Sequence, residues 1–236
     1  MTLPVYVTTS GRYLWALRPF AWLFNRFWSE QQLVRVITDL PPKFGLPPNF
    51  TVEAVGGGRA IPANRWSDSL IAALELMPES HLVLLLEDYW LVREVDQQGL
   101  SLLAEFAAMQ KDLLRLDLTD DRQYNGHARD VGYLGRYDLV ETPGTSEYQM
   151  SLQAAIWNRD LLLSVLKPGL SPWDVELSLS PELHGRQDLR VIGTRQCPVR
   201  YINVFKNSEG QALHGLDRLP LPERKEIEGF GWLQPG

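Results

Sequence analysis

The run HLVLLLED, residues 81–88, constrains the fold more than any other part of this sequence. Residues 82–86 are all apolar, so an extended segment here is hydrophobic on both of its faces. Such a strand is typical of the centre of a parallel sheet, because helices cover both faces there. Two adjacent carboxylates, Glu87 and Asp88, follow immediately. The sequence therefore predicts a buried central strand with two acids at its exit.

This strand, at 81–87, is the fourth in a series that alternates with helices. Short runs of apolar and β-branched residues predict the earlier strands, at 4–9, 33–38 and 50–55. Apolar residues at helical spacing predict helices at 11–28, broken or kinked near Pro19, and at 66–77. The alternation predicts an α/β fold with a mostly parallel central sheet flanked by helices.

The second half of the chain is more mixed. Helices are expected at 97–112, 158–166 and 171–180, the last with Ser171 as its N-cap and Pro172 at its first position. Strands are expected at 113–118, 189–194 and 199–205, together with a strand pair formed by 130–142 and 148–157. The tail after about residue 207 is rich in Pro, Gly and Glu, and we expect it to run over the surface.

Composition excludes several classes of protein. A net charge of −6 disfavours nucleic-acid binding, which needs a basic face. The single cysteine, Cys197, excludes an intramolecular disulfide and fits a reducing compartment. No apolar run approaches the roughly 20 residues that cross a bilayer, and the N-terminal segment has no features of a secretory signal. We therefore expect a cytoplasmic protein.

The aromatic-rich helix at 11–28 also carries Arg12, Arg18 and Arg26. Its aromatic residues surround most of the helix, which favours burial in the core. The alternatives are a homodimer contact and peripheral binding to the inner face of a membrane, close to a lipid-linked acceptor.

Polar residues follow three of the predicted strands, namely Thr8–Thr9–Ser10, Asp39 and Glu87–Asp88. Ligands of parallel α/β sheets bind beyond the carboxyl ends of the strands, so these groups are expected to lie along one edge. Two acids leaving a buried strand need water, a partner or a cation. A divalent ion shared with phosphate is one solution, and an ion pair with Arg93 or a capped turn is the other.

The order of these segments resembles that of the nucleotide-sugar glycosyltransferases of the GT-A fold, over roughly residues 4–205. The matching motifs are TTS at 8–10, VITD at 36–39, NRWSDS at 64–69, LLLEDYW at 84–90 and PWDVEL at 172–177. Two positions depart from the family pattern. Glu87-Asp88-Tyr89 stands in place of Asp-x-Asp, and Trp173 stands where an acid usually precedes the base.

The resemblance implies a role for each motif. Nucleotide and diphosphate contacts are implied for Thr8, Thr9, Ser10, Asp39, Arg65 and Asp68. Glu87 and Asp88 would hold Mg²⁺ or Mn²⁺, and Asp174 would be the general base with Glu176 as its near neighbour. Sugar or acceptor contacts are implied for Tyr89, Trp90 and Trp173. The implied domain is a single one over 1–236, with a nucleotide-binding half at 1–92, an acceptor-side half at 93–206 and a tail at 207–236.

The activity that this resemblance implies is transfer of a sugar, with inversion, from a nucleotide-diphosphate sugar to an acceptor hydroxyl. A glycan or lipid-linked acceptor in polysaccharide assembly would fit. A sugar-phosphate nucleotidyltransferase is the first alternative, although TTSGRYLW at 8–15 matches its glycine-rich loop poorly. A non-catalytic protein that binds sugar nucleotides or glycans on the same fold is the second.

Overall fold

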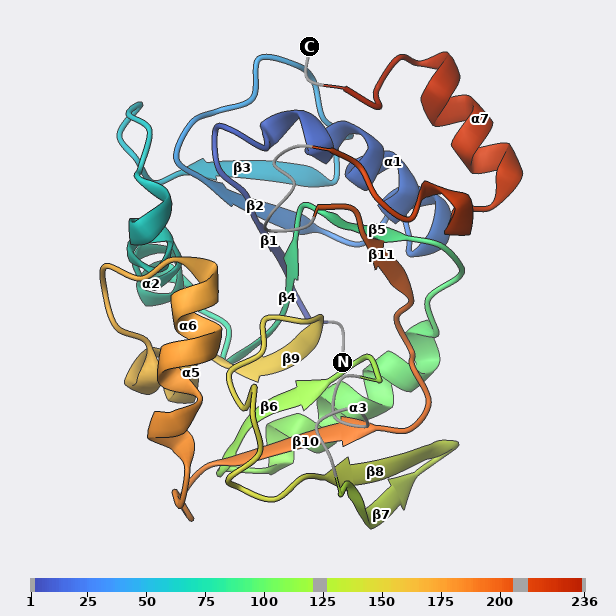
Figure 1. Cartoon of the computed structure of the whole chain (residues 1–236). Helices are drawn as coiled ribbons and strands as arrows, with labels where there is room; N and C mark the ends of the chain where they lie inside the picture. The colour runs from blue at the N-terminus through green and yellow to red at the C-terminus, as the bar shows by residue number, and fades with distance from the viewer. Residues whose placement is uncertain (1–2, 121–126, 206–211, 235–236) are drawn as a thin grey trace.

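A computed structural model describes residues 3–120, 127–205 and 212–234 (Figure 1). In this part of the chain the strands form a nine-stranded sheet in the order β3–β2–β1–β4–β9–β6–β10–β8–β7, and a two-stranded sheet of β5 and β11. The nine strands are β1 (Val5–Thr8), β2 (Val34–Thr38), β3 (Phe50–Ala54), β4 (His81–Leu86), β6 (Leu113–Asp117), β7 (Arg129–Leu134), β8 (Tyr137–Glu141), β9 (Ala155–Asn158) and β10 (Arg190–Thr194). The pair consists of β5 (Tyr89–Leu91) and β11 (Tyr201–Asn203).

Most strands of the large sheet run in one direction. Strands β3, β2, β1 and β4 pair in parallel, as do β6 and β10. The reversed strands are β9, between β4 and β6, and β8, between β10 and β7. The predicted α/β fold with a mostly parallel central sheet is therefore confirmed.

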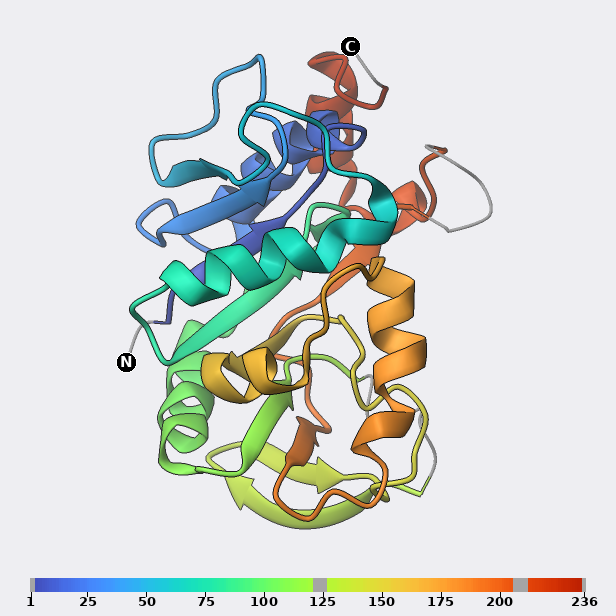
Figure 2. The ribbon, with the colours of Figure 1, turned by 90° about the vertical axis from the view of Figure 1, so that its left-hand side faces the viewer.

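Helices cover both faces of the sheet (Figures 1 and 2). They are α1 (Leu17–Phe27), α2 (Trp66–Leu76), α3 (Gln97–Met109), α5 (Arg159–Val165), α6 (Pro172–Leu179) and α7 (Leu221–Gly229), with 3-10 turns at Leu14–Ala16, Ala63–Arg65, Pro181–Leu183 and Leu216–Arg218. The core on one face includes α1 and α3, and the core on the other includes α2, α5 and α6.

Strand β4 shows why the fold needs both layers. Val83 and Leu85 belong to the core with α1 and α3, whereas Leu82 and Leu84 belong to the core with α2. Successive side chains of a strand point to opposite faces, so an unbroken apolar run fills two cores at once. The run that opens the sequence analysis therefore lies inside the sheet, between β1 and β9.

The predicted pairing of 130–142 with 148–157 is wrong. Residues 130–142 contain a hairpin of their own, β7–β8, whose turn places Gly135 at a φ of 58°. Positive φ is accessible to glycine without steric cost, so the chain reverses there. Strand β9 comes from the second segment, but it inserts between β4 and β6.

The N-terminal helix differs from the prediction at its start. A 3-10 turn at Leu14–Ala16 comes first, and the α-helix begins only at Leu17. Pro19 therefore falls in the first turn of α1, where its missing N–H has no partner to lose, and it does not break the helix. The helix buries Phe20, Phe24 and Phe27 in the core, as its aromatic content predicts.

The C-terminal tail is partly helical, which the sequence reading missed. Helix α7 buries Ile227, and its buried Glu223 bonds the Arg26 side chain of α1 at 3.1 Å. The first residues of the predicted tail, 207–211, lie outside the described part of the chain. No helix within the described ranges is long and apolar enough to cross a membrane.

A buried ion pair fixes the segment that follows residue 147. Arg115 and Asp117 on β6 are both fully buried, and their side chains approach to 2.5 Å. Arg115 also donates hydrogen bonds to the backbone carbonyls of Tyr148 and Gln149, and it lies over the indole of Trp157. The guanidinium therefore joins the sheet to the segment that leads into β9.

Removal of one member of this pair is expected to destabilise the fold. Asp117→Ala leaves the Arg115 charge buried without its carboxylate, which costs about 3–5 kcal/mol in the free energy of unfolding. The matched control is Asp160→Ala, whose carboxylate is 69% exposed and pairs with Arg159. That change is expected to cost less than about 1 kcal/mol. Urea denaturation measures both, and equal losses would contradict the interpretation.

Candidate functional site

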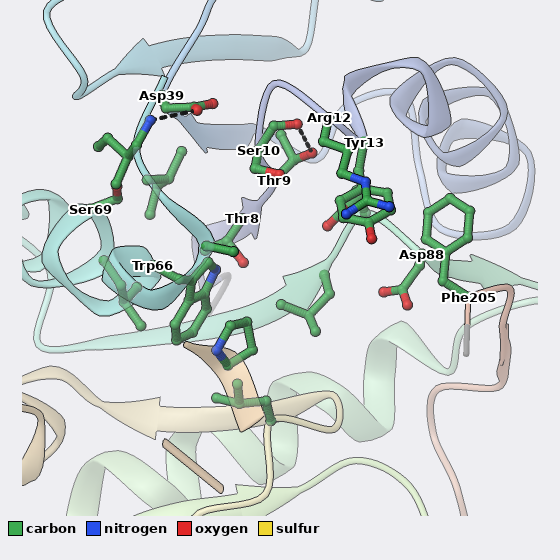
Figure 3. Close-up of a pocket in the computed structure, with 18 of the residues that line it drawn as sticks. Thr8, Thr9, Ser10, Arg12, Tyr13, Asp39, Trp66, Ser69, Asp88 and Phe205 are labelled. Carbon is green, nitrogen blue, oxygen red and sulfur yellow. Dashed lines mark hydrogen bonds between the residues drawn. The ribbon is translucent and has the colours of Figure 1, made fainter. Parts of the chain in front are cut away.

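A cavity of about 590 Å³ opens at the carboxyl ends of β1, β2 and β4 (Figure 3). The sequence-predicted residues that line it are Thr8, Thr9, Ser10, Asp39, Glu87, Asp88, Tyr89, Trp173 and Glu176. The first seven lie at or next to strand ends, and the last two, Trp173 and Glu176, lie on α6. The strand ends therefore meet at one edge, as expected, and α6 closes the opposite wall.

Asp39 organises two of the loops around the cavity. Its Oδ1 accepts a hydrogen bond from the backbone N–H of Gly11 at 2.6 Å, and its Oδ2 accepts one from the N–H of Ile61 at 2.9 Å. A Cβ at position 11 would lie 2.9 Å from a methyl carbon of Leu40, so the close approach depends on glycine. The buried carboxylate thus ties the loop after β1 to the loop before α2.

The acid pair forms the centre of the cavity wall. Glu87 and Asp88 are 8% and 9% exposed. Burial raises the pKa of Glu87 well above its usual range, the negative charge of Asp88 adds to this, and a hydrogen bond from the Thr9 side chain opposes it. Burial also raises the pKa of Asp88 to about 7, and the charge of Glu176 adds to this.

In the part of the chain that the structure describes, Asp88 lacks a hydrogen-bond partner for one of its carboxylate oxygens. Its Oδ1 is buried and has no hydrogen-bond partner among the described residues. The ion pair with Arg93 that the sequence left open does not form, because the Arg93 guanidinium donates to the carbonyl of Cys197. A proton or a cation in the cavity would satisfy this oxygen.

The donor set fits a metal ion that is shared with phosphate. Within the described ranges, no three histidine, cysteine or acidic side chains form a metal site by themselves. Mg²⁺ is commonly bound by one or two carboxylates while substrate phosphates and water complete its shell. Glu87 and Asp88, with the unpartnered Oδ1, match that requirement.

The two acids of α6 have different positions. Asp174 is exposed and lies outside the cavity lining, and its Oδ2 accepts hydrogen bonds from the backbone N–H and the hydroxyl of Ser171. These bonds lower the pKa of Asp174, that from the Ser171 side chain most of all. Glu176 lines the cavity, and its Oε1 accepts a hydrogen bond from the N–H of Leu152 at 2.7 Å.

Helical geometry explains the difference. Side chains two positions apart on a helix do not share a face, so only one of these acids can point to the cavity. The capping box of Ser171 and Asp174 holds Asp174 at the start of the helix, and Glu176 lies on the face that is directed to the cavity. The acid that the family pattern singled out as base caps its helix, and its neighbour occupies the site.

Three other predicted contacts also lie outside the cavity lining. Arg65 and Asp68 pair with each other at 2.5 Å, with the Arg65 side chain 63% exposed. Asp68 further accepts a hydrogen bond from the N–H of Gly169. Trp90 is fully buried, and its indole N–H donates to the carbonyl of Glu87 at 3.2 Å. In this arrangement these residues support the walls of the cavity from outside.

Several lining residues were missed by the sequence reading. Arg12 and Tyr13 follow β1, and in Figure 3 both lie near Asp88 and Phe205. Arg12 is the sole lysine or arginine of the lining among the described residues. The strand-end rule that identified Thr8–Ser10 would have found it two residues farther on. Other missed lining residues include Ile61, Gln153, Asn203 and Phe205, whereas Trp66 and Ser69 belong to the predicted motif NRWSDS.

Comparisons with known proteins assign this chain to no family. No family model matches the sequence, and no curated protein does. Three similar structures are the bifunctional IspDF of Campylobacter jejuni (TM-score 0.45, 15% identity, covering 94% of this chain and 55% of that one), TarS 1-349 of S. aureus (0.48, 15%, 82% and 58%) and a cytidylyltransferase of Leptospira borgpetersenii (0.46, 12%, 99% and 96%). The chain spans just over half the length of the first two. Because these TM-scores lie below 0.5, the fold assignment rests on the strand order itself.

The buried acids predict an unusual dependence of stability on pH. Because the pKa of Asp88 is raised to about 7, the folded state binds its proton more tightly than the unfolded state does. This contribution is fully present at acid pH and is lost as pH rises from the ordinary carboxyl range through about 7. In metal-free protein, Tm is therefore expected to be higher at pH 5 than at pH 8.

The variant Asp88→Asn should flatten this slope, because it removes the titrating group while keeping the shape of the side chain. Each 1 kcal/mol shifts Tm by about 2–4 °C in a chain of this size. Calorimetry between pH 5 and pH 8 measures the difference between wild type and variant. Parallel pH profiles for the two proteins would count against a buried titrating Asp88.

Proposed function

We propose that this chain is an inverting glycosyltransferase that moves a sugar from a nucleotide-diphosphate sugar to an acceptor hydroxyl. The observation that supports this most directly is the meeting, in one cavity, of the ends of β1, β2 and β4 with Glu176 of α6. Such a transfer needs a nucleoside site, compensation of the diphosphate charge and a base for the acceptor. The cavity offers a separate group of residues for each need.

The nucleoside would occupy the end of the cavity near Thr8, Ser10 and Asp39. Both carboxylate oxygens of Asp39 already bind backbone amides, so its main contribution is to hold the walls of this end in place. Ile61 and Trp66 supply apolar surface there for a flat base. The preformed walls would lower the entropy cost of binding.

The diphosphate would lie between Arg12 and the acid pair. Glu87 and Asp88 would hold Mg²⁺ or Mn²⁺, which neutralises charge on the phosphates of the leaving group. Arg12 would supply a second positive charge by direct contact with phosphate oxygen. Without a cation, ionised carboxylates of the cavity would repel a diphosphate, so we expect the reaction to depend on a metal ion.

Glu176 is proposed as the general base in place of Asp174. Its carboxylate would take the proton of the acceptor hydroxyl as that oxygen bonds to the anomeric carbon. The bond from the anomeric carbon to the diphosphate breaks, and the nucleoside diphosphate leaves with the electron pair. Attack opposite the leaving group inverts the configuration. Trp173, 40% exposed, would stack on a sugar ring of a glycan or lipid-linked acceptor.

One observation favours a second candidate, the sugar-phosphate nucleotidyltransferase. The loop after β1 places Arg12 in the lining of the cavity that also holds the acid pair, and in Figure 3 Arg12 lies near Asp88. In that reaction a phosphate oxygen of the sugar phosphate attacks the α-phosphorus of a nucleoside triphosphate, and pyrophosphate leaves. Release of pyrophosphate from a triphosphate and a sugar phosphate would favour this candidate over the first.

A nucleotide panel tests the proposed binding. UDP, GDP, CDP and dTDP are expected to raise Tm selectively for one base, and only with Mn²⁺ or Mg²⁺ present. Saturation at about 100 times Kd adds about 2.7 kcal/mol of stability. Asp88→Ala should abolish the metal-dependent shift, whereas the surface variant Asp160→Ala should keep it. If no diphosphate raises the Tm of wild type, the proposed function is wrong.

Kinetic measurements can distinguish the roles of the two acidic residues of α6. Glu176→Gln is expected to slow transfer, or the slow hydrolysis of the bound sugar nucleotide, by about 10²–10⁴-fold, because a general base contributes that much. Asp174→Asn should retain most of the activity, since its carboxylate lies outside the cavity and the asparagine amide oxygen can still accept the hydrogen bond from the Ser171 N–H. Release of nucleoside diphosphate measures both. Full activity in Glu176→Gln, with loss in Asp174→Asn, would restore the original assignment.

A further inference from the structure

Gln153 presents an oriented amide group to the cavity. The backbone N–H of Ala154 donates a hydrogen bond to the hydroxyl oxygen of Tyr201 at 3.3 Å, and that hydroxyl donates to Oε1 of Gln153. The amide oxygen is therefore the acceptor in this chain of bonds, which directs the Nε2 donors elsewhere. No described residue accepts a hydrogen bond from Nε2, although Gln153 lines the cavity.

The small sheet holds Tyr201 in place. Its ring stacks on that of Tyr89, with centroids 4.4 Å apart and planes inclined by 17°. The two residues belong to the antiparallel pair β5–β11, and the Tyr89 hydroxyl donates to the carbonyl of Leu152 at 3.2 Å. Both tyrosines therefore bind the 152–154 segment, and the orientation of Gln153 follows from strands that are distant in sequence.

The neighbouring residue fixes an acceptor of the same cavity. The N–H of Leu152 donates to Oε1 of Glu176, so the 152–154 segment holds both a carboxylate and the Gln153 amide, and both residues belong to the lining. A hydroxyl group both donates and accepts a hydrogen bond. A donor next to an acceptor therefore suits a sugar hydroxyl better than a phosphate, which only accepts.

We propose that the Gln153 amide, oriented by the Tyr201 hydroxyl, hydrogen-bonds a hydroxyl of the transferred pyranose and so selects among sugar nucleotides that share one base. This inference rests on the proposed function and names the specificity residue of that site. Gln153 touches the sugar, and Tyr201 acts through it as a positioning residue. The contribution should depend on the sugar and not on the nucleotide.

The test compares two kinds of ligand for each variant by isothermal titration calorimetry with Mn²⁺. One is the nucleoside diphosphate that binds wild type best, and the other is the set of its commercially available conjugates with glucose, galactose and N-acetylglucosamine or mannose. Gln153→Met keeps the length of the side chain without its donor, and Tyr201→Phe keeps the ring stack without the hydroxyl. Each is expected to weaken the best sugar nucleotide by about 3- to 10-fold, as for one lost hydrogen bond.

Affinity for the bare diphosphate should change by less than about 2-fold, since the nucleotide makes no contact with this amide. The preference of wild type between two epimeric sugars should also shrink in both variants. Gln98→Met and Tyr133→Phe, at exposed positions outside the cavity, are the matched controls and should behave as wild type. Tm values of the four variants identify any loss of folding.

Three results would overturn the inference. One is an equal loss for sugar nucleotide and bare diphosphate, and another is unchanged affinity for both in Gln153→Met. The third is a wild type that binds every sugar nucleotide with the affinity of the bare diphosphate. If wild type binds no nucleoside diphosphate at all, the proposed function fails as well, so the two failures are distinguishable.

Discussion

The rest of the site depends on two adjacent carboxylates that follow the central strand of the sheet and are largely buried from water. Strand β4 is apolar on both faces, so its exit lies within the molecule, where ionised Glu87 and Asp88 are costly. The surrounding loops offer a Thr9 side chain to Glu87 but leave Asp88 Oδ1 without a partner. In the proposed reaction, a metal ion bound with the diphosphate would offset this cost.

Local sequence patterns were sufficient to predict the helical layers of the fold and the edge of the sheet where the cavity lies. The apolar run of β4, the alternation before it and the polar residues at three strand ends each depend on neighbours in sequence, so periodicity finds them. The same holds for the start of α6, where Ser171, Pro172 and Asp174 mark the first turn as expected. These features predicted the fold class and six of the lining residues, and the family resemblance implied three more, Tyr89, Trp173 and Glu176.

The predictions that failed concern contacts between segments that are distant in sequence. The sequence of residues 130–158 indicates strands but not their partners, because pairing is set by the whole sheet. The sequence does not tell which of Asp174 and Glu176 faces the cavity, because this depends on how the capping box orients the helix. Gln153 and Asn203 carry no motif, and they reach the cavity only because β9 and β11 bring them there. Family motifs therefore indicated which elements line the cavity better than which of their residues face it.

The position of β9 has a consequence for how the chain is made. Strands β1 to β4 come from the first 86 residues of the sequence, yet one side of β4 is covered only by β9, which is synthesised much later. During translation this apolar strand would present an open edge, the kind of surface that invites aggregation. Pairing over such a sequence separation also raises contact order and slows folding. A nascent chain that stops before Ala155 would then be a natural client for chaperones.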